Sequence, residues 1–136
     1  MIASSYENGG NVVGRLVSWG ALVIVGFDLL ASVASRTIGF PYSYATVGSW
    51  LIYAAFGFMI GRRVNVGAAS LGVAIIAFVE ATVGWAVSWM IGPGRLPNGI
   101  PSIGVFAMTV VLVATTTGAI VGALAGVLGR VWPAHA

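Results

Sequence analysis

Four long apolar segments constrain this 136-residue chain more than any other feature. They run from about Val12 to Ser35, Tyr44 to Gly61, Val66 to Ile91 and Ile103 to Leu128. A helix needs roughly 20 apolar residues to cross a bilayer core about 30 Å thick, and the segments approach or exceed that length. In lipid, backbone groups must be satisfied within a helix or a closed barrel, and these segments lack the alternation of barrel strands. The sequence therefore predicts an all-α membrane protein with a bundle of four transmembrane helices.

Charged residues are too few for a protein that is soluble in water. Only 7% of the residues are charged, namely six Arg and three acids, whereas a soluble domain carries about 25%. This composition excludes a soluble enzyme and a nucleic-acid-binding protein. The chain has no Cys, and its single His lies at position 135. We therefore expect no catalytic residues, no metal site and no cofactor, and interpret the protein as one without enzymatic activity.

The linkers divide the chain into two hairpins. All five prolines lie outside the apolar segments, so we expect four unbroken helices. The four-residue linker 62–65 makes the second and third helices antiparallel neighbours, and the Gly- and Pro-rich loop 92–102 could cover one mouth of the bundle. The expected organisation is a polar N-terminal tail (1–11), a first hairpin (12–64), a second hairpin (65–131) and a C-terminal tail (132–136).

Arginines indicate the orientation of the bundle. Four of the six fall on the side of the two termini, and the excess of positive charge in loops marks the cytoplasmic side. We therefore expect an integral protein of a bacterial inner membrane with its N-terminus and C-terminus in the cytoplasm. The residues that serve as topology markers are Arg15, Arg62, Arg63 and Arg130.

The two hairpins resemble each other in sequence. A shift of 52 residues places Asp28 on Glu80, and a shift of 68 places the Gly-Arg pair 61–62 on the pair 129–130. We interpret this as a tandem duplication of a two-helix hairpin. Both copies would enter the membrane from the same side, which makes the repeat parallel, with its axis along the membrane normal. Asp28 and Glu80 would then lie at equal depth near the centre of the bundle.

An acidic residue at this depth in the membrane is energetically unfavourable unless its environment compensates for it. Its insertion costs roughly 2.5–3.5 kcal/mol, so it must face the bundle interior, a cavity or a partner. No basic residue of the chain lies at the same depth, and neutralisation must come from protons, a bound cation, hydroxyl groups or a partner. Asp28 and Glu80 are therefore our candidates for a proton or cation site. The alternative is that the acids only hydrogen-bond neighbouring helices together.

Other residues could line such a site. Hydroxyl groups of serines and threonines in the apolar segments could reach the acids or a pore, although such groups often bond to carbonyls of their own helix. The two tryptophans could bind an organic cation through their rings, or could simply belong to the aromatic belt at the membrane surface. The candidates for lining are Ser32, Ser88, Thr115, Thr116, Thr117, Trp85 and Trp89.

Glycines at four-residue spacing mark faces on which helices can approach closely. We expect these faces to pack within the bundle, with a homo-oligomer interface as the alternative. The candidates are Gly57 and Gly61 in the second helix, and Gly118, Gly122 and Gly126 in the fourth.

Two functional hypotheses remain open. The first is a transporter or channel-like protein whose central carboxylate pair binds protons or cations. The second is a non-catalytic accessory or assembly subunit of a larger membrane complex. A third, an intramembrane enzyme with two facing carboxyl groups, has no substrate cue to support it. The expected partners are the lipid bilayer and either further copies of the chain or a larger complex, without nucleic acid.

Overall fold

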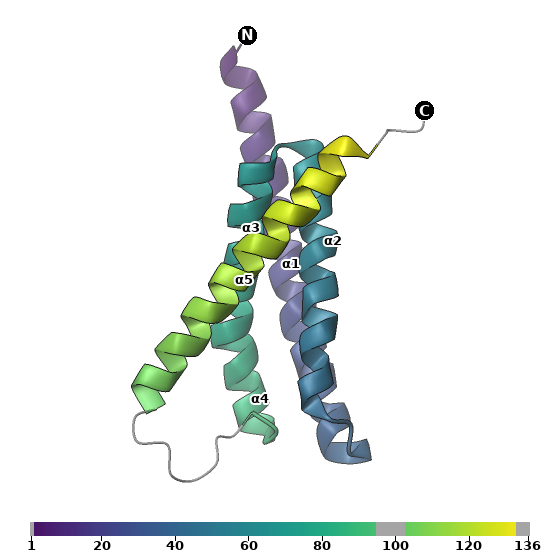
Figure 1. Cartoon of the computed structure of the whole chain (residues 1–136), viewed down its shortest axis with the longest axis vertical. Coiled ribbons are helices and arrows are strands. Elements are labelled where there is room, and N and C mark those ends of the chain that lie inside the picture. Colours follow the sequence, from purple (N-terminus) through teal and green to yellow (C-terminus); the bar gives the residue numbers. More distant parts are fainter. Residues whose placement is uncertain (1, 95–102, 133–136) are drawn as a thin grey trace.

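All elements in the described parts of the chain are helices. The computed structural model describes residues 2–94 and 103–132. Four helical segments are long and apolar enough to cross a membrane, namely Gly9–Ile38, Tyr42–Arg63, Val66–Ile91 and Gly104–Val131. The all-helical fold with four candidate membrane spans is therefore confirmed. The first helix begins and the last helix ends at the same end of the molecule (Figure 1).

The first span belongs to a helix that is longer than expected. Helix α1 runs from Ile2 to Ile38, so most of the segment expected as a polar tail forms its first turns. These turns project beyond the other helices (Figure 1). The helix ends at Gly39, whose φ of 71° is the left-handed conformation that commonly terminates helices. Pro41 follows and precedes the short 3₁₀ helix η1 (Tyr42–Tyr44).

A short turn joins the second and third spans. Helix α2 runs from Ala45 to Arg63 and helix α3 begins at Val66. Asn65 caps α3, because its side-chain oxygen accepts a hydrogen bond of 2.7 Å from the backbone N–H of Ala68. The turn is tight, and α2 and α3 pack side by side.

The third span is helical throughout but is not a regular α-helix. Helix α3 (Val66–Val79) continues into the π-helical turn η2 (Glu80–Gly84) and then into α4 (Trp85–Ile91). In this turn the backbone N–H of Trp85 bonds to the carbonyl of Glu80, five residues back. The hydroxyl of Thr82 donates to the carbonyl of Phe78 at 2.7 Å, which supplies a partner next to the irregular turn. The absence of proline therefore predicts the continuity of this span but not its change in hydrogen-bond pattern.

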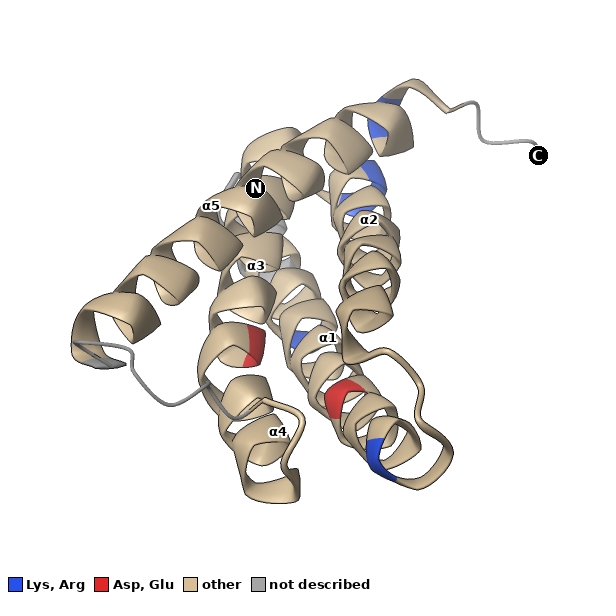
Figure 2. Cartoon of the chain, turned by 60° about the horizontal axis from the view of Figure 1, so that its bottom comes forward, with Lys and Arg blue, Asp and Glu red and all other residues tan. Residues whose placement is uncertain are grey.

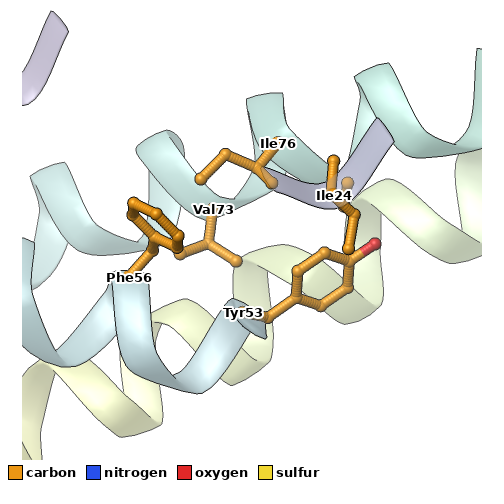
Figure 3. Packing of buried hydrophobic residues seen from close by; sticks show 6 residues of the cluster. Ile24, Tyr53, Phe56, Val73 and Ile76 are labelled. Atoms are coloured by element: carbon orange, nitrogen blue, oxygen red, sulfur yellow. The ribbon is translucent and has the colours of Figure 1, made fainter. Parts of the chain in front are cut away.

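Three of the four spans contribute to a small hydrophobic core. Its labelled members are Ile24 of α1, Tyr53 and Phe56 of α2, and Val73 and Ile76 of α3 (Figure 3). The ring of Tyr53 packs among the aliphatic side chains, while its hydroxyl points away from them (Figure 3). The core therefore holds this phenol ring in a defined position.

Helix α5 (Ile103–Val131) crosses α2 and α3 at glycines. A β-carbon on Gly57 would lie 2.9 Å from the α-carbon of Gly122, and one on Gly61 would overlap the backbone of Gly126. A β-carbon on Gly118 would lie 3.0 Å from the carbonyl oxygen of Val73 in α3. All five candidate packing glycines thus face another helix of the same chain. Beyond this crossing, α5 diverges from the lower part of α2 in Figure 1.

The packing of the two hairpins is not twofold symmetric. Helices α2 and α3 are in contact, whereas α1 and α5 are not, within the ranges 2–94 and 103–132. The π-helical turn in the second hairpin also has no counterpart in α1. The duplication and its parallel arrangement therefore remain predictions.

Candidate functional site

Asp28 and Glu80 open onto the same cavity, which has a volume of about 460 Å³. Figure 2 shows acidic positions on α1 and on the third span, away from the basic positions at the ends of α2 and α5. The remaining lining comes from η1, α2, η2, α4 and α5. It consists of Tyr42, Ala45, Thr46, Ser49, Trp50, Tyr53, Ala81, Trp85, Thr109, Val110, Val113, Ala114 and Thr117.

Asp28 is almost completely buried, with 3% of its surface exposed. The hydroxyl of Tyr42 donates a long hydrogen bond of 3.5 Å to its Oδ1 atom. Its Oδ2 atom lies against Gly84, where a β-carbon would overlap it. The absence of a side chain at Gly84 therefore makes room for this carboxyl group.

Glu80 is held by two hydroxyl groups from the neighbouring helix. Ser49 donates a hydrogen bond to Oε1 and Tyr53 donates one to Oε2. These two donors lie one helical turn apart on α2, so both hydroxyl groups reach Glu80 from the same face of that helix. Both are nearly inaccessible to solvent, and the core around the Tyr53 ring fixes the direction of its hydroxyl. Each carboxylate oxygen of Glu80 thus has one neutral donor.

The π-helical turn brings the two acids together. A β-carbon built on Gly84 would lie 3.1 Å from the carboxyl carbon of Asp28 and 3.5 Å from the γ-carbon of Glu80. Glu80 opens this turn and Gly84 closes it. The two acidic side chains therefore meet beside one residue of the irregular turn.

No basic side chain lines the cavity among the described residues. The groups that donate to the two acids are the neutral hydroxyls of Tyr42, Ser49 and Tyr53. A pair of carboxylates in a medium of low polarity needs positive charge to offset it. A proton, a bound cation or a basic group of a partner would each supply that charge. The described residues include no cluster of three or more potential metal-binding side chains.

Only some of the other residues that the sequence suggested as lining belong to the cavity. Trp85 and Thr117 line the cavity together with the acids. Trp89 does not, and instead its ring packs on that of Trp85 with 5.5 Å between centroids. Thr116 is exposed on α5.

Three buried hydroxyls lie outside the cavity lining. Ser32 and Ser88 are fully buried and lie close to the hydroxyl of Tyr42. The hydroxyl of Thr115 in α5 is also buried and has no hydrogen-bond partner among the described residues. Ser32 and Ser88 therefore lie near Tyr42 without lining the cavity.

Sequence reasoning missed several residues of the site. The polar pair Ser49 and Tyr53, spaced by four residues on an apolar helix, was a signal that could have revealed the partners of Glu80. Tyr42 and Trp50 also line the cavity, and nothing in the sequence alone sets these two aromatic residues apart. Gly84 carried no such signal, since its role depends on the π-helical turn.

A further contact ties the two acid-bearing spans together at the end away from the termini. The guanidinium of Arg36, in the last turn of α1, donates a hydrogen bond of 2.8 Å to the carbonyl of Ile91 at the end of α4. The topology markers Arg15, Arg62, Arg63 and Arg130 are all exposed. The loop expected to cover one mouth lies mostly outside the described residues.

Comparison with protein-family models, with curated proteins and with solved structures finds no match to this chain.

Proposed function

We propose that this protein is a small transporter or channel-like membrane protein that binds protons or cations at Asp28 and Glu80. The observation that carries the proposal is the shared cavity. Both carboxyl groups face one space of about 460 Å³ between helices long and apolar enough to span a bilayer. Acidic residues in such helices commonly mark ion and proton pathways.

Charge balance supports exchange of protons against cations. An ionised carboxylate without a positive partner is costly in a medium of low polarity. A proton on the carboxyl group or a cation beside it removes that cost. The state with neither is therefore rarely occupied, and entry of a cation is coupled to release of a proton. Ser49 and Tyr53 donate hydrogen bonds to Glu80 and so fix the position of its carboxyl group.

The proposed orientation places both termini in the cytoplasm of a bacterial inner membrane. Four exposed arginines lie on the terminal side of the chain, which supports this orientation. We also propose that the hairpins are a parallel repeat. Ser49 and Thr117 are separated by the same 68-residue shift that relates the two helices, and both line the cavity.

Ion flux from reconstituted vesicles tests the transport function. The purified chain is reconstituted with an internal pH indicator, and proton movement is followed under an imposed pH gradient, with Na⁺, K⁺ or an organic cation on one side. We expect flux above that of empty vesicles. The double variant Asp28→Asn/Glu80→Gln should reduce it to the level of empty vesicles, because neither amide can carry a proton or balance a cation.

Glu7→Gln is the matched control. It makes the same chemical change as Glu80→Gln, in the same chain, but before the first candidate span, which begins at Gly9. Its flux should equal that of the wild type. Equal flux from the double variant and the wild type would refute the proposal, as would wild-type flux no greater than that of empty vesicles.

The alternative function is an accessory or assembly subunit of a larger membrane complex. It is favoured by the first turns of α1, which project beyond the other helices and could contact a partner (Figure 1). Mass determination after purification in a gentle detergent separates the two functions. A different protein present in fixed ratio would support the accessory role, and a species made only of this chain would support the transporter.

A further inference from the structure

Resting on the proposed cation site, we infer that the cargo is a hydrophobic organic cation that enters the cavity sideways from the bilayer, between α2 and α5. The inference combines the size of the cavity, its aromatic lining and the position of its exposed lining residues. Each of these goes beyond what binding of a proton or an inorganic ion requires.

The cavity has the size of a site for an organic molecule. Its volume of about 460 Å³ falls within the range of roughly 300–1,000 Å³ that is usual for small-molecule pockets. A water molecule, by comparison, occupies about 30 Å³ of the liquid. A proton or a single dehydrated metal ion would therefore leave most of the cavity unused.

Aromatic rings surround the two acids. Tyr42, Trp50, Tyr53 and Trp85 all line the cavity, and Trp85 also packs against Phe106 of α5, with 6.3 Å between ring centroids. The face of an aromatic ring attracts a cation, most strongly for Trp. The lining thus combines negative charge from the acids with surfaces that favour a large, weakly hydrated cation.

The carboxyl groups are less suited to direct coordination of a metal ion. Hard metal ions such as Ca²⁺ take six or more oxygen ligands. Both oxygens of Glu80 instead receive hydroxyl groups from Ser49 and Tyr53, and Asp28 is packed against Gly84. An organic cation needs only nearby negative charge and apolar contact, which this cavity provides.

The exposed part of the lining faces outward between two spans. Trp50 of α2 is 50% exposed and Val113 of α5 is 60% exposed, and Thr46 and Thr109 are exposed as well. The two helices touch at the glycine crossing and diverge away from it (Figure 1). Outward surfaces of these spans contact lipid when the helices cross a bilayer, so the mouth opens to the membrane. A cargo using it must partition into the bilayer.

Binding of tetraphenylphosphonium tests the chemical class of the cargo. The full chain in lipid nanodiscs is titrated with the radiolabelled cation, with empty nanodiscs as the background. We expect saturable binding that the neutral analogue triphenylphosphine oxide does not displace. The variants Asp28→Asn and Glu80→Gln should each weaken it by at least about tenfold, since each removes a charge from a medium of low polarity.

Tryptophan variants test the aromatic lining. Trp50→Leu and Trp85→Leu should each weaken binding by about two- to thirtyfold, the range of a cation–π contact. Trp19→Leu is the matched control, because Trp19 is 61% exposed on α1 and does not line the cavity. It should bind as the wild type does. These variants keep both acids, so they remain informative if an acid variant fails to fold.

A pair of neighbouring residues tests the sideways entry. Val113 and Leu112 are 60% and 62% exposed on α5, but only Val113 lines the cavity. Val113→Phe should slow association of tetraphenylphosphonium several-fold, while Leu112→Phe should leave it unchanged. Equal association rates for the two variants and the wild type would overturn entry between α2 and α5.

The outcomes separate this inference from the function on which it rests. Proton flux without saturable binding of the cation would refute the organic cargo and leave the proton or inorganic-ion site intact. Saturable binding without any flux would support the cargo class and refute transport. Binding that survives both acid variants, or that the neutral analogue displaces, would reflect apolar partitioning and would overturn the inference.

Discussion

Gly84 lies directly against the carboxyl group of Asp28, in the position where any other residue would place a β-carbon on the Oδ2 atom. The two residues belong to different spans and are 56 positions apart in the sequence. Gly84 also closes the π-helical turn that Glu80 opens. This contact therefore sets how closely the acid-bearing spans approach each other at the candidate site.

Adding a single methyl group at this position should disturb the site. In Gly84→Ala, the new β-carbon would force the Asp28 carboxyl group to move, and overpacking of this kind typically costs about 1–3 kcal/mol. Asp28 is the only Asp in the chain, so ¹³C labelling of Asp carboxyl groups reports on it alone by NMR. We expect its carboxyl resonance to shift. Gly26→Ala is the control, because a β-carbon there meets no atom within 4 Å, and an unchanged resonance in Gly84→Ala would contradict the contact.

Tyr53 and Glu80 should be energetically coupled. Tyr53→Phe keeps the ring in the core but removes the donor to Oε2, and the free energy of unfolding should fall by about 0.5–1.5 kcal/mol. In the Glu80→Gln background the same change should cost a different amount, with a coupling of at least about 0.5 kcal/mol. Denaturation of the four variants in detergent measures this cycle. Tyr44→Phe, at a residue 63% exposed, should show no coupling to Glu80→Gln, whereas additive effects at Tyr53 would argue against the hydrogen bond.

The glycine crossing should tolerate no side chain. In Gly61→Ala, the β-carbon would overlap the backbone of Gly126, where no side-chain rotation can relieve the clash. We expect the free energy of unfolding to fall by about 1–3 kcal/mol. Gly104→Ala on α5 meets no atom within 4 Å and should leave stability nearly unchanged. If Gly61→Ala instead kept full stability and altered only the oligomeric mass, these glycines would serve an interface between copies.

Single cysteines can test the proposed orientation, because the natural chain contains none. Gly10→Cys lies near the N-terminal end of α1, and Ser43→Cys lies in η1 at the opposite end of the bundle. Both positions are exposed. With the termini in the cytoplasm, a membrane-impermeant maleimide added to intact cells should label Ser43→Cys only. Labelling of Gly10→Cys alone would reverse the orientation, and permeabilised cells provide the control in which both react.

The prediction of the fold from the sequence succeeded where length and composition decide the answer. Each span satisfies its own backbone hydrogen bonds, so a run of apolar residues is sufficient to identify it. The end of α1 before Gly39 and the start of α3 after Asn65 also depend on local chemistry. The π-helical turn contains no proline or other local signal, so its position could not be predicted from the sequence.

For the candidate site, the sequence determined that two acids lie within candidate membrane spans and that no basic residue lies at their depth. Burying an unpaired charge is costly however the helices pack, so these acids must face the interior of the bundle, a cavity or a partner. Tertiary structure decided what surrounds them. Ser49 and Tyr53 reach Glu80 only because α2 packs beside the third span, and Asp28 meets Gly84 only because α1 packs against the irregular turn. The cavity beside them exists because α5 crosses α2 at glycines and then diverges, a consequence of packing between helices that no single segment encodes.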